Sequence, residues 1–212
     1  MDLNVITNQR RRLVETNVNF LQNKVFLEFG VCTGKSMLEY HWLYDSHNIQ
    51  ADFYGFDSFE GLPEETKDEK SPWVVGEFSM NKHINPELLT KTNIKIKDGW
   101  YSATLNEELS KELKGKKAGI IHIDCDIYTS TLEVLEYVIQ NDLLTEGTIL
   151  VYDDWGVWRQ VNLTEQEEYS LGEGRAHKEV CEKYNLRFDL INKDVVDPTF
   201  YEIATFVYKG KK

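Results

Sequence analysis

The chain has 212 residues, enough to bury one sizeable hydrophobic core and too few for two domains of ordinary size. Hydrophobic residues make up 41% and aromatic residues 12%, which is typical of a globular protein, so we do not expect a disordered chain. Acidic residues outnumber basic ones by 36 to 24, so the formal net charge is −12. Because like charges repel, this balance disfavours nucleic acid and anionic membrane surfaces as partners.

Features of the sequence also predict the compartment. No apolar run approaches the about 20 residues that a membrane-spanning helix needs. The first residues lack the charged start and apolar core of a secretion signal. The three cysteines, Cys32, Cys125 and Cys181, are odd in number and contain no Cys-x-x-Cys pair, which indicates reduced thiols. We therefore expect a cytoplasmic protein.

Strand-like and helix-like segments alternate along the chain, as in a parallel sheet with crossover helices. After a helical arm over residues 1–24, the pattern predicts strand Val25–Phe29, helix Lys35–Asp45, strand Asp52–Phe56, strand Asn93–Lys97, helix Ala103–Lys114 and strand Ala118–Ile123. It then predicts helix Ser130–Asn141, strand Thr148–Tyr152, helix Arg175–Tyr184 and strands Arg187–Asn192 and Ile203–Tyr208.

The last two predicted strands are joined without a helix, so they should form an antiparallel hairpin. The expected fold class is α/β, a three-layer α/β/α sandwich. Its Rossmann-like sheet has seven strands, is mostly parallel and ends in a C-terminal antiparallel hairpin. One domain should span residues 1–212.

Two long connections accompany this framework, and such connections in compact domains are usually functional. Residues 58–92 form an excursion near the predicted cleft and carry three of the four prolines. Residues 155–174 are predicted to be a flap. Trp73, Trp155 and Trp158 should flank the cleft, where they could stack on an aromatic group or on one another.

The turn after the first strand contains Gly30 and Gly34, which let the backbone approach a ligand closely. A phosphate-binding P-loop needs one more residue between its glycines, and a dinucleotide fingerprint needs a glycine where Cys32 stands. An acid-x-Gly-x-x-x-Gly turn suits S-adenosylmethionine, because Glu28 could lie near the ammonium group of its methionine part. A simple tight turn is the alternative.

Carboxylates follow the other predicted strands. Asp57 ends the second strand, where an acid can bind a ribose diol or merely cap a turn. Asp124 and Asp126 follow the fourth strand, and the pair Asp153 and Asp154 follows the fifth. Strand ends of a parallel sheet meet at one edge, so these four carboxylates should converge and repel one another. A Mg²⁺ ion would relieve the repulsion. Alternatively, some of the acids, above all Asp126, cap the following helices.

With these residues identified, the chain resembles the macrocin-type (TylF-like) O-methyltransferases, which use S-adenosylmethionine and Mg²⁺ to methylate sugar hydroxyls on antibiotics. The stretches that carry the resemblance lie within residues 25 to 155 and are Leu27–Val31, Gly55–Pro63, Asp98–Tyr101 with Thr104-Leu105, Ile123–Thr131 and Gly147–Asp154.

The resemblance implies a role for individual residues. Cofactor contacts are expected from Glu28, Gly30, Gly34, Ser36, Asp57, Ser58, Gly99, Trp100 and Asp124, with Asp57 on the ribose and Ser58 or Gly99-Trp100 on the adenine side. The metal ligands would be Asp124, Asp153 and Asp154. The cation would lower the pKa of the acceptor hydroxyl and hold it against the methyl group.

The chain departs from related enzymes in two places. Its N-terminal arm is short for the family, and that arm helps to shape the acceptor site. Metal-dependent catechol-type relatives place a lysine base where this chain has Ile127, so the catalytic candidates are Asp124, Asp126 and His177.

Other residues have structural interpretations. The run Arg10–Arg12 should be a solvated helix face, and His122 a hydrogen-bonded core histidine. Cys32 and Cys125 should be packing residues.

We expect a Mg²⁺-assisted O-methyltransferase that acts on a small hydroxylated metabolite, a sugar or a glycan component. The resemblance also suggests a homo-oligomer. Two alternatives remain at this point: a P-loop-like kinase or NTPase with Lys35 and Ser36 on phosphates, and a non-catalytic binding protein with the methyltransferase fold.

Overall fold

A computed structural model describes residues 3–65, 73–80, 83–155, 169–197 and 201–212. In these residues a seven-stranded sheet has the order β3-β2-β1-β4-β5-β7-β6. Its strands are β1 (Val25–Phe29), β2 (Phe53–Asp57), β3 (Ile94–Asp98), β4 (Ala118–Ile123), β5 (Ile149–Tyr152), β6 (Leu186–Asp197) and β7 (Tyr201–Lys211).

The first five strands are parallel, and β7 is antiparallel to both β5 and β6. The predicted fold class is thus confirmed, including the antiparallel C-terminal hairpin. The order reverses direction between β1 and β4, which is the point at which open α/β sheets bind their ligands.

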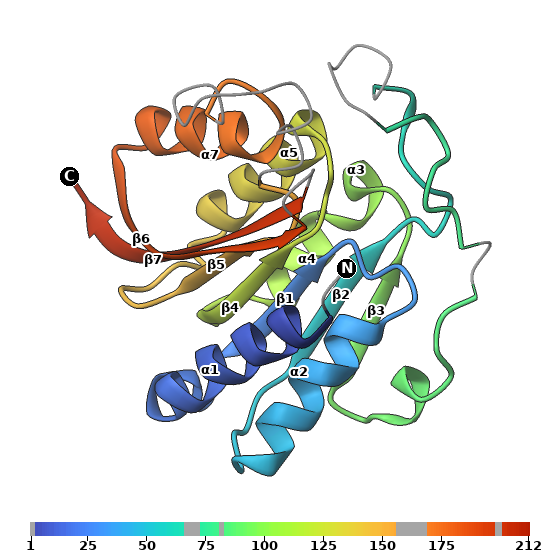
Figure 1. Ribbon diagram of the computed structural model, residues 1–212, viewed down its shortest axis with the longest axis vertical. Helices are drawn as coiled ribbons and strands as arrows, with labels where there is room; N and C mark the ends of the chain where they lie inside the picture. Colours follow the sequence, from blue (N-terminus) through green and yellow to red (C-terminus); the bar gives the residue numbers. More distant parts are fainter. Residues whose placement is uncertain (1–2, 66–72, 81–82, 156–168, 198–200) are drawn as a thin grey trace.

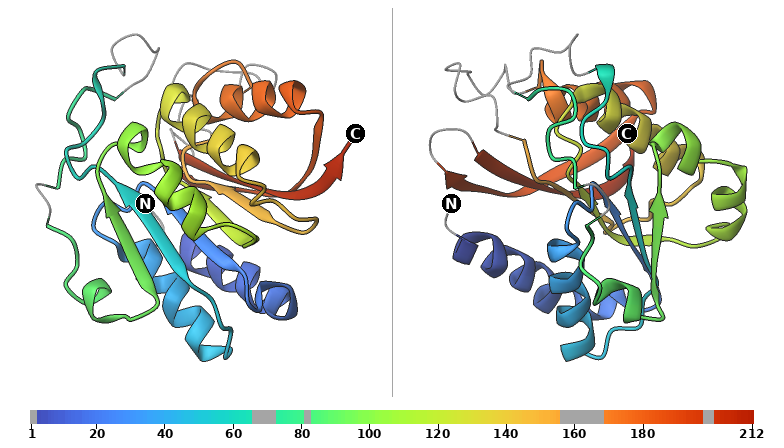
Figure 2. Two further views of the ribbon diagram at one scale, coloured as in Figure 1. Left: turned by 180° about the vertical axis from the view of Figure 1, so that it is seen from behind. Right: turned by 90° about the vertical axis from the view of Figure 1, so that its right-hand side faces the viewer.

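Helices cover both faces of the sheet and make the three layers (Figures 1 and 2). On one face lie α1 (Leu3–Leu21) and α2 (Lys35–Ser46); on the other lie α3 (Tyr101–Thr104), α4 (Glu107–Glu112), α5 (Tyr128–Gln140) and α7 (Gly172–Lys183). Each layer has its own apolar core. Val14, Leu21 and Met37 pack on the first face, and Val134 and Val180 on the second. β1 and β4 are buried along their whole length because both faces are covered.

One predicted helix is divided in two. The helix expected over Ala103–Lys114 consists of α3 and α4, and the break lies at Leu105 and Asn106. Asn106 has extended backbone angles, and its Oδ1 accepts hydrogen bonds from the N–H groups of Glu108 and Leu109. An asparagine N-cap satisfies the free amides at a helix start, so it ends one helix and begins the next.

The arginine run on α1 differs partly from its prediction. Arg11 and Arg12 are exposed as expected, but Arg10 is only 7% exposed. Its guanidinium pairs with Glu39 of α2 at 2.7 Å and lies 5.6 Å from the ring centroid of Tyr40. The prediction of a solvated face was therefore wrong for Arg10, because its side chain turns inward against α2.

The two long connections are described in part. In the excursion, a short 3₁₀ helix, η2 (Leu88–Thr90), precedes β3. Most of the predicted flap, residues 156–168, lies outside the described residues. Its end does not: α7 begins at Gly172, and Gly172, Glu173 and Gly174 are all buried. The described end of this segment is therefore part of the packed fold.

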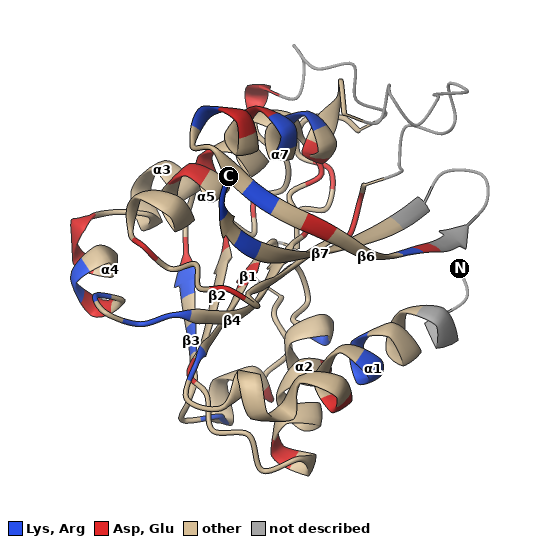
Figure 3. Cartoon of the chain, turned by 90° about the vertical axis from the view of Figure 1, so that its left-hand side faces the viewer, with Lys and Arg blue, Asp and Glu red and all other residues tan. Residues whose placement is uncertain are grey.

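Charged residues of both signs alternate along α7 and the β6–β7 hairpin in Figure 3. This side of the described chain thus presents no continuous basic stripe of the kind that binds nucleic acid. Among the described residues, no helix is long and apolar enough to cross a membrane.

Candidate active site

A cavity of about 380 Å³ lies at the carboxyl ends of β1, β2, β3, β4 and β5, within the size range of small-molecule sites. Six of the nine predicted cofactor residues line it: Gly30, Asp57, Ser58, Gly99, Trp100 and Asp124. The other three, Glu28, Gly34 and Ser36, are not among its lining residues.

The glycine turn after β1 places two segments in close contact. Gly30 has a φ of 92°, and a Cβ there would lie 1.9 Å from the carbonyl oxygen of Asp124. A glycine therefore lets the β1 turn lie directly against the end of β4. Gly34 has a φ of 80°, and its missing Cβ would lie 1.9 Å from Cδ1 of Leu88. Since Leu88 covers Gly34, this part of the turn packs against η2 and does not cradle a phosphate, which argues against the P-loop alternative.

Asp57 at the end of β2 connects two loops of the cavity. Its Oδ2 accepts the N–H of Cys32 at 2.7 Å, and its Oδ1 accepts the N–H of Phe59 at 2.6 Å. Burial raises the pKa of Asp57, although these backbone hydrogen bonds oppose the shift. Each carboxylate oxygen can accept more than one hydrogen bond. The side chain can thus hold the β1 turn in place and still bind a diol in the cavity.

Aromatic side chains form one wall of the cavity. Trp100 is 38% exposed, and the rings of Trp73 and Phe78 meet edge to face at 5.0 Å. Trp155 does not flank the cavity as predicted. It is 2% exposed and packs on Tyr152 and Phe206. The third predicted tryptophan, Trp158, lies outside the described residues.

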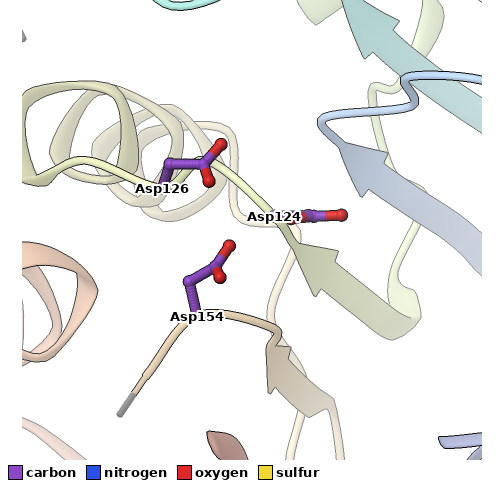
Figure 4. A group of neighbouring side chains, drawn as sticks. All are labelled: Asp124, Asp126 and Asp154. Atoms are coloured by element: carbon purple, nitrogen blue, oxygen red, sulfur yellow. The ribbon is translucent and has the colours of Figure 1, made fainter. Parts of the chain in front are cut away.

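Three carboxylates of the cavity lining lie close together. Asp124 follows β4, Asp126 lies two residues further on, and Asp154 follows β5 (Figure 4). One oxygen from each lies within 4.8 Å of the other two. In Figure 4 the side chains of Asp126 and Asp154 point toward each other, with Asp124 beside them. Asp126 adopts a φ of 62°, a strained conformation for a non-glycine residue.

Burial is the main cause of the raised pKa values of these three aspartates, and the charges of neighbouring carboxylates add to it. Carboxylates this close cannot all ionise without compensation. The triad is thus suited to a hard divalent cation, which prefers carboxylate oxygens. The capping alternative is not supported, because α5 has Ile127 as its N-cap and no side-chain cap.

Asp153 occupies a different environment from the adjacent Asp154. Its Oδ1 lies 3.2 Å from Nε2 of His122 and 3.9 Å from the guanidinium of Arg10. Of the predicted ligands Asp124, Asp153 and Asp154, the structure brings Asp124 and Asp154 together, with Asp126 beside them. Asp153 belongs to a buried network on the α1 side of the sheet.

The same network contains Glu28 and Ser36. Nδ1 of His122 lies 3.0 Å from Oε1 of Glu28, which also accepts a hydrogen bond from the hydroxyl of Ser36. Burial opposes a charge on His122, yet the hydrogen bonds to Asp153 and Glu28 raise its pKa to about 10. His122 is thus the hydrogen-bonded core histidine that the sequence predicted. Glu28 and Ser36 belong to this network and are not among the described lining residues of the cavity.

His177, the other predicted catalytic candidate, is not among the described lining residues of the cavity. It lies on α7, where its ring stacks on Phe206 at 4.4 Å and its Nδ1 is 2.9 Å from the hydroxyl of Tyr152. Burial lowers its pKa to about 3. Cys32 and Cys125 both line the cavity, and burial raises the pKa of both thiols.

Sequence analysis missed Glu173, a carboxylate with 1% exposure at the start of α7. It accepts backbone N–H groups from Cys125 and Asp154, and burial raises its pKa to about 8. No signal in the sequence separated it from the surface acids of a predicted flap.

The chain is similar to known methyltransferases. Residues 7–172 match the macrocin O-methyltransferase (TylF) family. Among curated proteins there is no significant match. In solved structures, the calicheamicin methyltransferase CalS11 has a TM-score of 0.68 at 17% identity, covering 95% of this chain and 77% of that one. The O-methyltransferase NovP has a TM-score of 0.63 at 16% identity, covering 96% of this chain and 79% of that one.

A third structure shares the fold and holds a cofactor product. It is an O-methyltransferase from Bacillus cereus in complex with SAH, with a TM-score of 0.55 at 12% identity, covering 95% of this chain and 81% of that one. The structural likenesses establish the fold. The family match over most of the chain establishes more: the protein belongs to the macrocin O-methyltransferase (TylF) family and is an S-adenosylmethionine-dependent methyltransferase.

Proposed function

We propose that the protein transfers a methyl group from S-adenosylmethionine to a hydroxyl of a small acceptor, a sugar or a glycan component, with Mg²⁺ bound by Asp124, Asp126 and Asp154. The observation that carries the proposal is that these three carboxylates line the same cavity as Asp57 and the Gly30 turn.

The lining of the cavity supports a position for each part of the cofactor. The backbone at Gly30 and Cys32 would lie along the methionine part, and Asp57 would accept hydrogen bonds from the ribose diol. Trp100 offers an exposed ring for the adenine. The sulfonium would then lie near Asp124, whose carboxylate suits its positive charge.

The donor set also fits a magnesium ion, because three partly buried carboxylates need a cation to offset their repulsion. When bound, Mg²⁺ would lower the pKa of the acceptor hydroxyl and fix its orientation. Asp126 is the remaining candidate base. The oxygen of its carboxylate that does not hold the cation would accept the hydroxyl proton as the acceptor oxygen bonds to the methyl carbon and the carbon–sulfur bond breaks.

The charge of the lining favours an acceptor without a phosphate group. Five carboxylates line the cavity, and none of the described lining residues is lysine, arginine or histidine: the five are Asp57, Glu77, Asp124, Asp126 and Asp154. CalS11 is described as a TDP-rhamnose 3′-O-methyltransferase. For the present chain we propose a neutral or cationic acceptor, because a diphosphate would meet like charge here.

Calorimetric titration with S-adenosylhomocysteine, with and without Mg²⁺, tests the proposal. The wild-type protein should bind it, and Asp57→Asn should bind about 10-fold more weakly. The asparagine side chain has only one acceptor oxygen, which would have to serve two backbone N–H groups and the ribose diol. Asp154→Asn should lose Mg²⁺ affinity but keep its metal-free affinity for S-adenosylhomocysteine.

Asp189→Asn is a matched control, because Asp189 is an exposed residue of the edge strand β6. It should match the wild type in both titrations. Absence of S-adenosylhomocysteine binding by the wild type would overturn the placement of the cofactor. Unchanged Mg²⁺ affinity in both Asp124→Ala and Asp154→Asn would overturn the metal site.

A further inference from the structure

The aspartate triad lies on two loops, the one after β4 and the one after β5. Backbone hydrogen bonds to the neighbouring strand hold each loop only at its first residue. The N–H of Asp124 donates to Phe29 at 2.8 Å, and the N–H of Asp153 donates to Ile123 at 2.9 Å. The next amide in each loop has no strand beside it. These are the N–H groups of Cys125 and Asp154, in the peptides that connect directly to Asp124 and Asp153.

One side chain accepts both of these amides. Oε1 of Glu173 accepts the N–H of Cys125 at 3.3 Å, and Oε2 accepts the N–H of Asp154 at 3.2 Å. Glu173 lies in the first turn of α7, is 1% exposed and reaches the site from outside the sheet. Figure 1 shows α7 beside α5 on the same face of the sheet.

We propose that Glu173 is a positioning residue for the metal site, because its two oxygens set the spacing between the loop of Asp124 and Asp126 and the loop of Asp154. The proposal rests on the metal site of the proposed function and adds a residue that does not itself bind the metal.

The chemistry of the contact requires a carboxylate of this length. Two N–H donors need two acceptor oxygens, and a carboxyl group offers two oxygens in one plane. An amide of the same shape offers one oxygen and would set its NH₂ group against the second N–H donor. Aspartate keeps both oxygens, but it is one methylene shorter and cannot span both loops from the same backbone position.

Three variants separate the length of the Glu173 side chain from its two acceptor oxygens and from general effects on α7. Glu173→Gln replaces one acceptor oxygen by an NH₂ group, whereas Glu173→Asp keeps both oxygens and loses the reach. Glu182→Gln makes the same chemical change at an exposed position of α7 and serves as the control.

The first measurement is amide hydrogen exchange of the metal-free protein. Exchange at Cys125 and Asp154 should be at least 10-fold faster in both Glu173 variants than in the wild type, and unchanged in Glu182→Gln. The second measurement is calorimetric titration with Mg²⁺ alone. Both Glu173 variants should bind about 10-fold more weakly, the usual effect of losing a residue that orients metal ligands. Metal-free affinity for S-adenosylhomocysteine should stay within about 2-fold of the wild type.

The outcomes are distinguishable. If the wild type binds no Mg²⁺, the proposed metal site is wrong, while the amide-exchange result still tests whether Glu173 holds the two loops. If Glu173→Asp binds Mg²⁺ as tightly as the wild type, the reach of the side chain does not matter and the positioning role is wrong. Unchanged exchange at both amides in Glu173→Gln would overturn the proposal as well.

Discussion

The site depends on the absence of a side chain at Gly30 as well as on its carboxylates. Gly76 provides a comparison, because a side chain there would meet nothing. Gly30 and Gly76 both have a positive φ, of 92° and 77°. A Cβ at Gly30 would lie 1.9 Å from the Asp124 carbonyl oxygen, whereas a Cβ at Gly76 would have no heavy atom within 4 Å.

Gly30→Ala should therefore combine backbone strain with a steric clash, and Gly76→Ala should have the strain alone. We expect Gly76→Ala to lower the free energy of unfolding by about 1–2 kcal/mol. Gly30→Ala should lower it by at least about 3 kcal/mol and weaken S-adenosylhomocysteine binding. Urea denaturation of the two variants tests the difference, and equal losses would show that the close approach is not required.

Single residues show where prediction from sequence succeeds. Asp57 and Asp124 line the cavity as expected, because the end of a parallel strand fixes their place. Glu28 was expected to contact the cofactor but is not among the described lining residues of the cavity, and its motif does not reveal which face of the sheet it occupies. It is paired in register with His122, and both side chains face the α1 layer. Asp153 and Asp154 are adjacent, and adjacent residues of an extended chain point to opposite sides.

At the level of helices and strands, the contact between α7 and β7 creates a pH dependence. Burial lowers the pKa of His177 to about 3, from an ordinary value of 6.5. Below pH 6.5 the unfolded chain binds a proton at this residue and the folded chain does not. The free energy of unfolding therefore decreases as the pH is lowered from 6.5 to about 3. Between pH 7 and pH 5 this one group should lower the free energy of unfolding by about 2 kcal/mol.

His177→Phe removes the titrating group and keeps a ring against Phe206. The variant should lose correspondingly less stability between pH 7 and pH 5 than the wild type, whatever its stability at pH 7. Urea denaturation at both pH values gives the comparison. If the free energy of unfolding changes equally with pH in the wild type and the variant, His177 takes up its proton in the folded state as well.

Elements were predicted well where periodicity was strong. β1 and β4 begin and end at their predicted residues because both are short apolar runs bounded by polar ones. The division into α3 and α4 was missed because the apolar spacing continues across the break. Only the backbone at Asn106 reveals its role as a cap.

Across the whole molecule, the alternation of strands and helices was sufficient to predict the layers and the antiparallel hairpin. It could not predict the buried network that connects four elements beneath the site. Arg10 of α1, Asp153 after β5, His122 of β4 and Glu28 of β1 meet there, from positions far apart in the sequence. Such contacts depend on side-chain direction, which hydrophobic periodicity does not specify.

The network predicts that the N-terminal helix stabilises the site end of the sheet. Arg10 lies 2.7 Å from Glu39 and 3.9 Å from Asp153, and its side chain is 9% exposed. Arg10→Gln should leave these two carboxylates without their cation and lower the free energy of unfolding by about 3 kcal/mol. Arg12→Gln makes the same change at an exposed position of the same helix and should have an effect within about 0.5 kcal/mol. Urea denaturation at neutral pH provides both values. A loss below about 1 kcal/mol in Arg10→Gln would show that water or His122 compensates the carboxylates, and that α1 is held by apolar packing alone.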